Sequence, residues 1–172
     1  MTWTSPAPDG DADGPMTGPE RPILEGMLAW HRSTLLNICA GLTAEQLASR
    51  PIPSTGLTLL GLVRHMAKVE RIWFRKRVAG EDIEHLHRFE ARDDTDFRAI
   101  DPADAEAAVA QLADEQAAAA SAVAALDLDT EIDVHGGAMS LRMVHVHMIQ
   151  EYARHNGHAD LLRERIDGAT GD

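Results

Sequence analysis

Apolar residues recur at alternating steps of three and four in four long stretches of this chain, and this spacing limits the folds open to it. Such a period places one side chain per turn on the same face of an α-helix. The four predicted helices span about 23–40, 58–78, 102–126 and 140–166. Short connections and one long crossover, residues 79–101, then predict an all-α fold: a four-helix bundle with negligible strand content.

Local signals mark several of the boundaries between these helices. Ser140 is placed to cap the last helix, and Thr43 with Gln46 predicts a capping box on a short helical turn. The stretch DLDTEIDVHGGAMS is expected to be an extended connection that turns at Gly136 and Gly137.

The two ends of the chain differ in composition from the rest. Residues 1–20 are rich in Pro, Gly and Asp, which predicts a disordered leader. Residues 21–168 are expected to form one domain, and residues 169–172 a flexible tail.

Composition excludes several classes of partner. The net charge of -12 argues against nonspecific binding to nucleic acid, which requires a surplus of Lys and Arg, and against docking on anionic membranes.

Cys39 is the single cysteine, so no internal disulfide forms, and its apolar surroundings favour a buried, inert thiol. No apolar run is long enough to span a membrane and no targeting signal is evident, so a cytoplasmic location is expected.

The predicted fourth helix carries titratable residues where its apolar face should continue. Its core-facing positions are Leu141, Val144, Met148, Glu151, His155, His158 and Leu162. A buried carboxylate must be paired, hydrogen-bonded or bound to a metal. Glu151 and His155 are four residues apart, so both side chains project to the same place, as two ligands of one divalent ion would.

A third ligand is expected from the second helix, where His65 shares a face with Leu62 and Val69. Histidine and carboxylate ligands without thiolate suit Zn²⁺, Ni²⁺, Mn²⁺ or Fe²⁺. Three protein ligands leave a coordination position for water or substrate. Two alternatives stay open: a hydrogen bond between Glu151 and a histidine without metal, and a ligand pair formed by His147 and Glu151.

The remaining histidines are weaker candidates. His158 continues the core-facing row and is interpreted as a neighbour of the ligands, and His31 as a buried structural residue. A loop or surface position is expected for His85, His87, His135 and His145.

Three strings of the chain resemble the DinB-like metal-binding four-helix bundles. They are AWHRSTLLNICAGLTAEQL in the first helix, LTLLGLVRHMAKVERIWF in the second and SLRMVHVHMIQEYARHNGHADLLRERIDG in the fourth, and the similarity spans about residues 20–168. Most members use three histidines, matched here by His65 and His155 at two positions. Glu151 stands at the third, a departure shared by the mycothiol-dependent, maleylpyruvate isomerase-like branch with its His/Glu/His zinc site.

The resemblance implies a fold, an activity and partners. The fold would be an up-down-down-up bundle with the crossover between helices two and three, and a homodimer is common in the superfamily. The activity would be a zinc-dependent S-transferase that activates mycothiol or a similar low-molecular-weight thiol for attack on an electrophilic small molecule. Alternatives are a metal-dependent hydrolase, a non-catalytic metal-binding stress-response module and a purely structural bundle.

Charged residues flank the expected ligands. Arg64, Lys68, Arg154 and His158 are the candidates for binding the thiol co-substrate, and Arg71 lies on the same helix as the first two. A solvated helix face is the alternative interpretation for each of the cationic residues.

Overall fold

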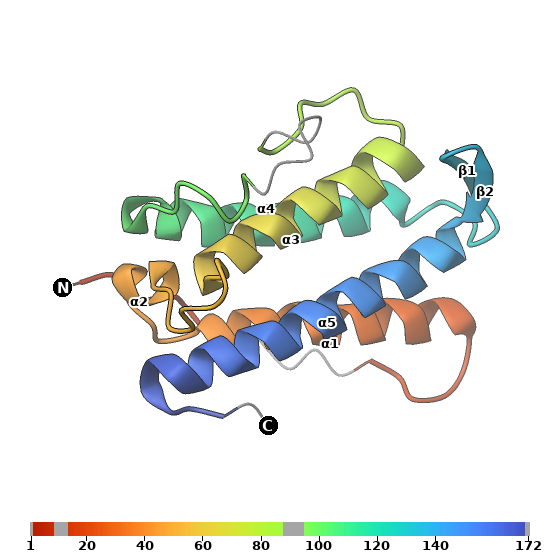
Figure 1. The fold of residues 1–172 in the computed structure, drawn as a ribbon. Coiled ribbons are helices and arrows are strands. Elements are labelled where there is room, and N and C mark those ends of the chain that lie inside the picture. The colour runs from red at the N-terminus through yellow and green to blue at the C-terminus, as the bar shows by residue number, and fades with distance from the viewer. Residues whose placement is uncertain (1, 9–13, 88–94, 171–172) are drawn as a thin grey trace.

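The computed structural model describes residues 2–8, 14–87 and 95–170, and shows a mostly helical chain with a small two-stranded sheet (Figure 1). Its elements are α1 Glu20–Cys39, α2 Ala44–Ala48, α3 Leu59–Glu70, η1 Arg71–Val78, η2 Pro102–Asp104, α4 Ala105–Val123, β1 Glu131–Val134, β2 Gly137–Ser140 and α5 Leu141–Asp167. Within the described residues, no helix is both long and apolar enough to cross a membrane.

The long helices pack in pairs. α1 lies beside α5, α3 and η1 lie against α4, and α3 also contacts α5 (Figure 1). The core between them is formed by fully buried side chains that include Leu35, Leu62, Met66, Leu112 and Met148. Because α3 contacts α5 directly, residues on the facing sides of these two helices can form one site.

The predicted second helix divides into two segments. Thr58 is the N-cap of α3, and its hydroxyl accepts a hydrogen bond from the Gly61 amide at 2.9 Å. From Arg71 onward the helix widens into the π-helix η1. Across this change Arg71 and Arg75 both reach the carboxylate of Glu115 on α4, with N–O distances of 3.0 Å from Arg71 Nε and Arg75 Nη1. The π-helix is a difference from the single regular helix expected for 58–78.

The expected extended connection before α5 forms a β-hairpin. β1 and β2 pair antiparallel, from Glu131 opposite Ser140 to Val134 opposite Gly137. The turn lies at His135 and Gly136, with φ of 56° and 82°, one residue earlier than the glycine pair suggested. Two residues with positive φ are typical of the two-residue turns that match the twist of paired strands.

The ends of α5 and the cap of α2 agree with expectation. Ser140 Oγ accepts a hydrogen bond from the Met143 amide, and Gly168 ends the helix with a φ of 81°. Thr43 and Gln46 form a reciprocal capping box. These signals act locally, so the sequence predicts them well.

The N-terminal strap, residues 2–8, differs from the disordered leader expected there. The Ser5 amide donates to the Leu42 carbonyl at 2.9 Å, and the Gly41 amide donates to the Ser5 carbonyl at 2.8 Å. Trp3 packs against the core, which offsets the cost of ordering the segment. Residues 1, 9–13, 171 and 172 of the expected leader and tail lie outside the described residues.

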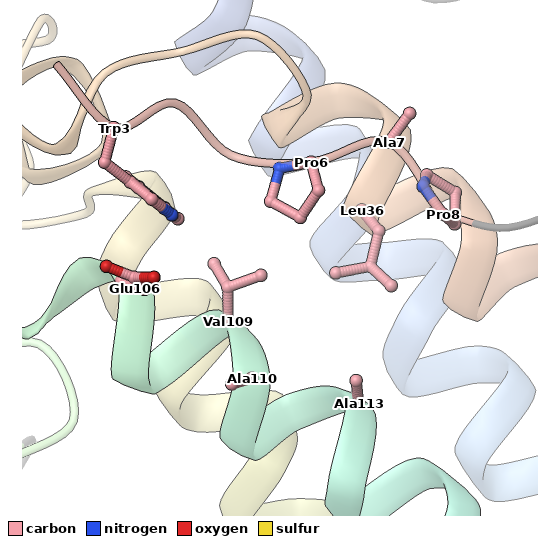
Figure 2. Close-up of a pocket in the computed structure, with 9 residues that line it drawn as sticks. All are labelled: Trp3, Pro6, Ala7, Pro8, Leu36, Glu106, Val109, Ala110 and Ala113. Carbon is pink, nitrogen blue, oxygen red and sulfur yellow. The ribbon is translucent and has the colours of Figure 1, made fainter. Parts of the chain in front are cut away.

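A pocket of about 440 Å³ lies under the N-terminal strap. Figure 2 shows the strap crossing the gap between α1 and α4, with Trp3 and Glu106 on one side of the pocket and Leu36 of α1 on the other. Its lining is mostly apolar, and it shares no residue with the site described next.

Candidate metal centre

Three side chains from two helices converge at one place between α3 and α5. His65 comes from α3, and Glu151 and His155 come from successive turns of α5. One ligand atom from each lies within 4.8 Å of the others. The ring centroids of His65 and His155 are 4.8 Å apart, and His155 Nε2 lies 3.4 Å from Glu151 Oε2. The predicted trio is therefore brought together.

The site is partly enclosed. His155 is 8% exposed, while the side chains of His65 and Glu151 are 19% and 20% exposed. Burial, followed by the neighbouring His65, lowers the pKa of His155 to about 4, and Glu151 acts in the opposite direction. His155 is consequently neutral at pH 7, the form in which an imidazole nitrogen binds a metal.

The donor set fits a divalent metal ion. Two imidazoles and one carboxylate match the ligands of catalytic zinc sites, which keep a position for water or substrate. Zinc holds such donors at about 2.0–2.2 Å, so donors within 4.8 Å of one another need only small side-chain rotations to converge. The contact between His155 and Glu151, at 3.4 Å, lies at the long end of hydrogen-bond distances, so it gives little support to a metal-free pair.

The alternative pair of His147 and Glu151 receives no support from the geometry. His147 packs its ring on Trp73, with centroids 4.4 Å apart, and does not belong to the cluster.

His65 has a partner that the sequence interpretation missed. The Nδ1 atom of His65 lies 3.0 Å from Oδ2 of Asp96, a residue of the crossover that is 1% exposed. Lys68 forms an ion pair with the same carboxylate oxygen. Burial by itself raises the pKa of Asp96, but the hydrogen bonds from His65 and Lys68 outweigh it and lower the pKa below its usual value. The irregular sequence around Asp96 has no periodicity that signals this contact.

His158 lies beside His155, as expected of a neighbour of the ligands. Their Nδ1 atoms are 3.4 Å apart and their ring centroids 5.5 Å apart. His158 is half-buried and lies near Nδ1 of His155, whereas Glu151 lies near Nε2 of the same ring.

The cationic candidates have different surroundings. Lys68 is buried against Asp96. Arg71 is held by Glu115. Within the described residues, Arg64 makes long contacts, at 3.4 Å, to the carbonyls of Thr95 and Ala99 and to His87. Arg154 is exposed, and its charge contributes to lowering the pKa of His155.

His145 is wrongly placed by the sequence interpretation. It is 2% exposed within α5, with its ring 5.2 Å from Phe74 and its Nδ1 atom 3.0 Å from the Leu141 carbonyl. Because α5 contacts both α1 and α3, it buries a second row of side chains that the single predicted row omits.

The thiol of Cys39 is fully buried, as expected. Burial raises its pKa to about 12, and the charge of Arg163 only partly opposes this. A thiol with this pKa is protonated at pH 7 and is a poor nucleophile.

A known protein family matches most of the chain. The sequence model of the mycothiol-S-transferase family matches residues 23–168, a range that holds His65, Glu151 and His155. A search of curated proteins found no match.

Proposed function

The chain belongs to the mycothiol-S-transferase family, and on this premise we propose that it transfers mycothiol or a similar low-molecular-weight thiol to an electrophilic small molecule. The family match also confirms the resemblance to the mycothiol-dependent branch of DinB-like proteins. The observation that carries the proposal is the convergence of His65, Glu151 and His155 between α3 and α5.

In this proposal the three residues hold a divalent metal, with zinc the first choice. Such an ion supplies a Lewis acid that lowers the pKa of a bound thiol and makes a thiolate available at neutral pH. His65 and His155 bind as neutral imidazoles. Glu151 adds one negative charge, which leaves the site less electrophilic than three neutral ligands would.

The thiol comes from a co-substrate. Cys39 is buried and protonated, and it is the single cysteine of the chain, so the protein has no competing nucleophilic thiol. This property supports a transferase that uses an external thiol.

The co-substrate is bound on the open side of the site in this proposal. Arg154 is exposed and adjoins His155 in sequence, the contacts of Arg64 within the described residues are long, and His158 lies beside His155, so these three offer groups to a polar thiol. Lys68 is committed to Asp96 and contributes to the site through that residue.

We extend the proposal to the arrangement of the long helices. In it the long helices form a DinB-like four-helix bundle whose crossover joins the second and third of them, and the contacts of α1 with α5, of α3 with α4 and of α3 with α5 support this arrangement. The homodimer and the cytoplasmic location remain predictions.

Elemental analysis and a conjugation assay test the function. Purified protein is expected to hold one transition-metal ion per chain and to conjugate mycothiol to monochlorobimane. The variants His65→Ala and Glu151→Gln should lose both properties, because the first removes a donor and the second replaces the charged carboxylate with a neutral amide. His147→Ala, on α5 but outside the cluster, is the matched control and should keep both.

The outcomes separate the alternatives. A stoichiometric metal without conjugation by any small thiol would reject the transferase and favour a hydrolase or a binding module. Protein that holds no metal, and whose cluster variants behave like wild type, would reject every catalytic version.

A further inference from the structure

The carboxylate of Asp96 is buried at the edge of the metal centre without belonging to the ligand cluster. It is 1% exposed, and its Oδ2 atom contacts both His65 Nδ1, at 3.0 Å, and Lys68 Nζ. A buried carboxylate with a histidine and an ammonium as partners must serve either the packing of the crossover or the orientation of the histidine.

The chemistry of imidazole gives the contact with His65 a definite consequence. A neutral imidazole has one N–H and one lone pair. When the Nδ1–H group donates a hydrogen bond to a carboxylate, the lone pair resides on Nε2. Asp96 therefore selects the tautomer of His65 whose Nε2 is able to bind a metal.

The crossover is held tightly against α3 at this point. The Phe97 ring lies 5.3 Å from the His65 ring, centroid to centroid. A Cβ atom on Gly61 would lie 2.8 Å from Phe97 Cδ1, so the absence of a side chain at Gly61 permits this approach. Lys68, about one helical turn after His65, is 9% exposed and forms an ion pair with the same carboxylate oxygen.

We propose that Asp96 is a positioning residue for His65: anchored by Lys68, it keeps Nδ1 protonated and fixes the ring so that Nε2 serves the site shared with Glu151 and His155. The part of this inference that concerns metal affinity rests on the proposed function. The part that concerns the tautomer does not.

Nitrogen-15 NMR of metal-free protein tests the tautomer. In spectra recorded where the His65 ring is neutral, wild-type His65 should carry its proton on Nδ1. In Asp96→Asn, and in the double variant Lys68→Met/Asp96→Leu, the population should shift toward Nε2–H, the tautomer favoured by free histidine in water. The double variant removes the buried charge pair together, which protects the fold. A wild-type His65 protonated on Nε2 would overturn the proposal.

Zinc affinity, measured by competition with a chromophoric chelator, tests the consequence. Asp96→Asn should bind zinc about 10- to 100-fold more weakly than wild type. Glu115→Gln is the matched control. Glu115 is also buried, at 3% exposed, and pairs with Arg71 and Arg75 of η1, but it lies outside the ligand cluster. It should lose stability and keep its zinc affinity.

The two measurements distinguish the possible failures. Unchanged zinc affinity in Asp96→Asn, with normal binding by wild type, would overturn the positioning role. If wild type binds no zinc, the proposed function fails, and the NMR result still decides whether Asp96 sets the tautomer of His65.

Discussion

His145 shows how one buried imidazole affects this protein. It is a residue of α5 whose ring packs against Phe74. Burial is the main cause that lowers its pKa below the usual value, and it outweighs the hydrogen-bonded Leu141 carbonyl and the charge of Glu25, which both raise the pKa. Folded His145 therefore stays neutral at a pH where the unfolded chain already takes up a proton.

The free energy of unfolding should consequently depend on pH through His145. Its contribution is complete above about pH 6.5, the usual histidine pKa, and is lost as the pH falls from there toward the folded-state pKa. One proton difference gives a slope of at most about 1.4 kcal/mol per pH unit. In urea titrations of metal-free protein, His145→Gln should show a shallower slope than wild type in this range. Identical slopes would contradict the prediction.

The residues in and around the candidate metal centre were predictable to different degrees. Glu151 and His155 stand in the core-facing row of a long helix, and His65 shares a face with apolar residues, so helical periodicity is enough to find them. Asp96 lies in an irregular segment, and its contact with His65 depends on where the crossover passes. His145 was missed because the helix buries two rows of side chains and the prediction followed one.

At the scale of elements, two helical glycines have opposite surroundings. A Cβ atom on Gly61 in α3 would meet Phe97 Cδ1 at 2.8 Å and Thr58 Oγ1 at 3.0 Å. Around a Cβ atom on Gly157 in α5, by contrast, no described residue outside the neighbouring residues and backbone of α5 has an atom within 4 Å. Glycine costs a helix about 0.5–1 kcal/mol relative to alanine. The same substitution therefore has opposite consequences in the two helices.

Gly157→Ala should raise the free energy of unfolding by about 0.5–1 kcal/mol. Gly61→Ala should lower it, by about 1–3 kcal/mol before the helical gain is subtracted, because overpacking displaces the crossover. Urea denaturation of both variants measures the difference. A stabilised Gly61→Ala would show that the crossover does not depend on this close approach.

The boundaries of elements followed from local signals more readily than their internal form. The caps at Thr43 and Ser140 involve residues three apart and were predicted. The position of the hairpin turn at His135 and Gly136 depends on how the two strands pair. The π-helix that begins at Arg71 depends on a widening of the helix, which the spacing of apolar residues does not signal. Both arise from contacts between elements.

At the scale of the whole molecule, one buried hydrogen-bonded network joins the four long helices. Glu70, at the end of α3, accepts hydrogen bonds from Arg32 of α1 at 2.7 and 2.6 Å and from the Tyr152 hydroxyl of α5 at 2.8 Å. Gln116 of α4 donates to the same hydroxyl at 3.0 Å. Because Tyr152 adjoins Glu151, the network also fixes α5 relative to α3 beside the metal centre.

Breaking this network should cost more stability than removing it as a unit. Arg32→Met leaves the fully buried Glu70 without its cation and should cost about 3–5 kcal/mol. Tyr152→Phe removes one hydrogen bond to the carboxylate and should cost about 1.5–3 kcal/mol. Arg32→Met/Glu70→Leu should recover part of the loss of the first variant in urea denaturation. An additive, larger loss in the double variant would contradict this account.

The cluster of His65, Glu151 and His155 also has a consequence for the unfolded chain. His65 precedes the crossover, α4 and the hairpin, and Glu151 follows them, so a bound ion would cross-link two distant points and close a long loop. Such a cross-link lowers the configurational entropy of the unfolded chain, which is also how a disulfide stabilises a fold. This chain has a single cysteine and cannot form an internal disulfide. A chelator should therefore lower the Tm of metal-loaded wild type and leave the Tm of His65→Ala unchanged. An equal shift of Tm in both proteins would contradict stabilisation by this cross-link. One bound ion would thus constrain more than half of the domain in the way that a covalent cross-link does.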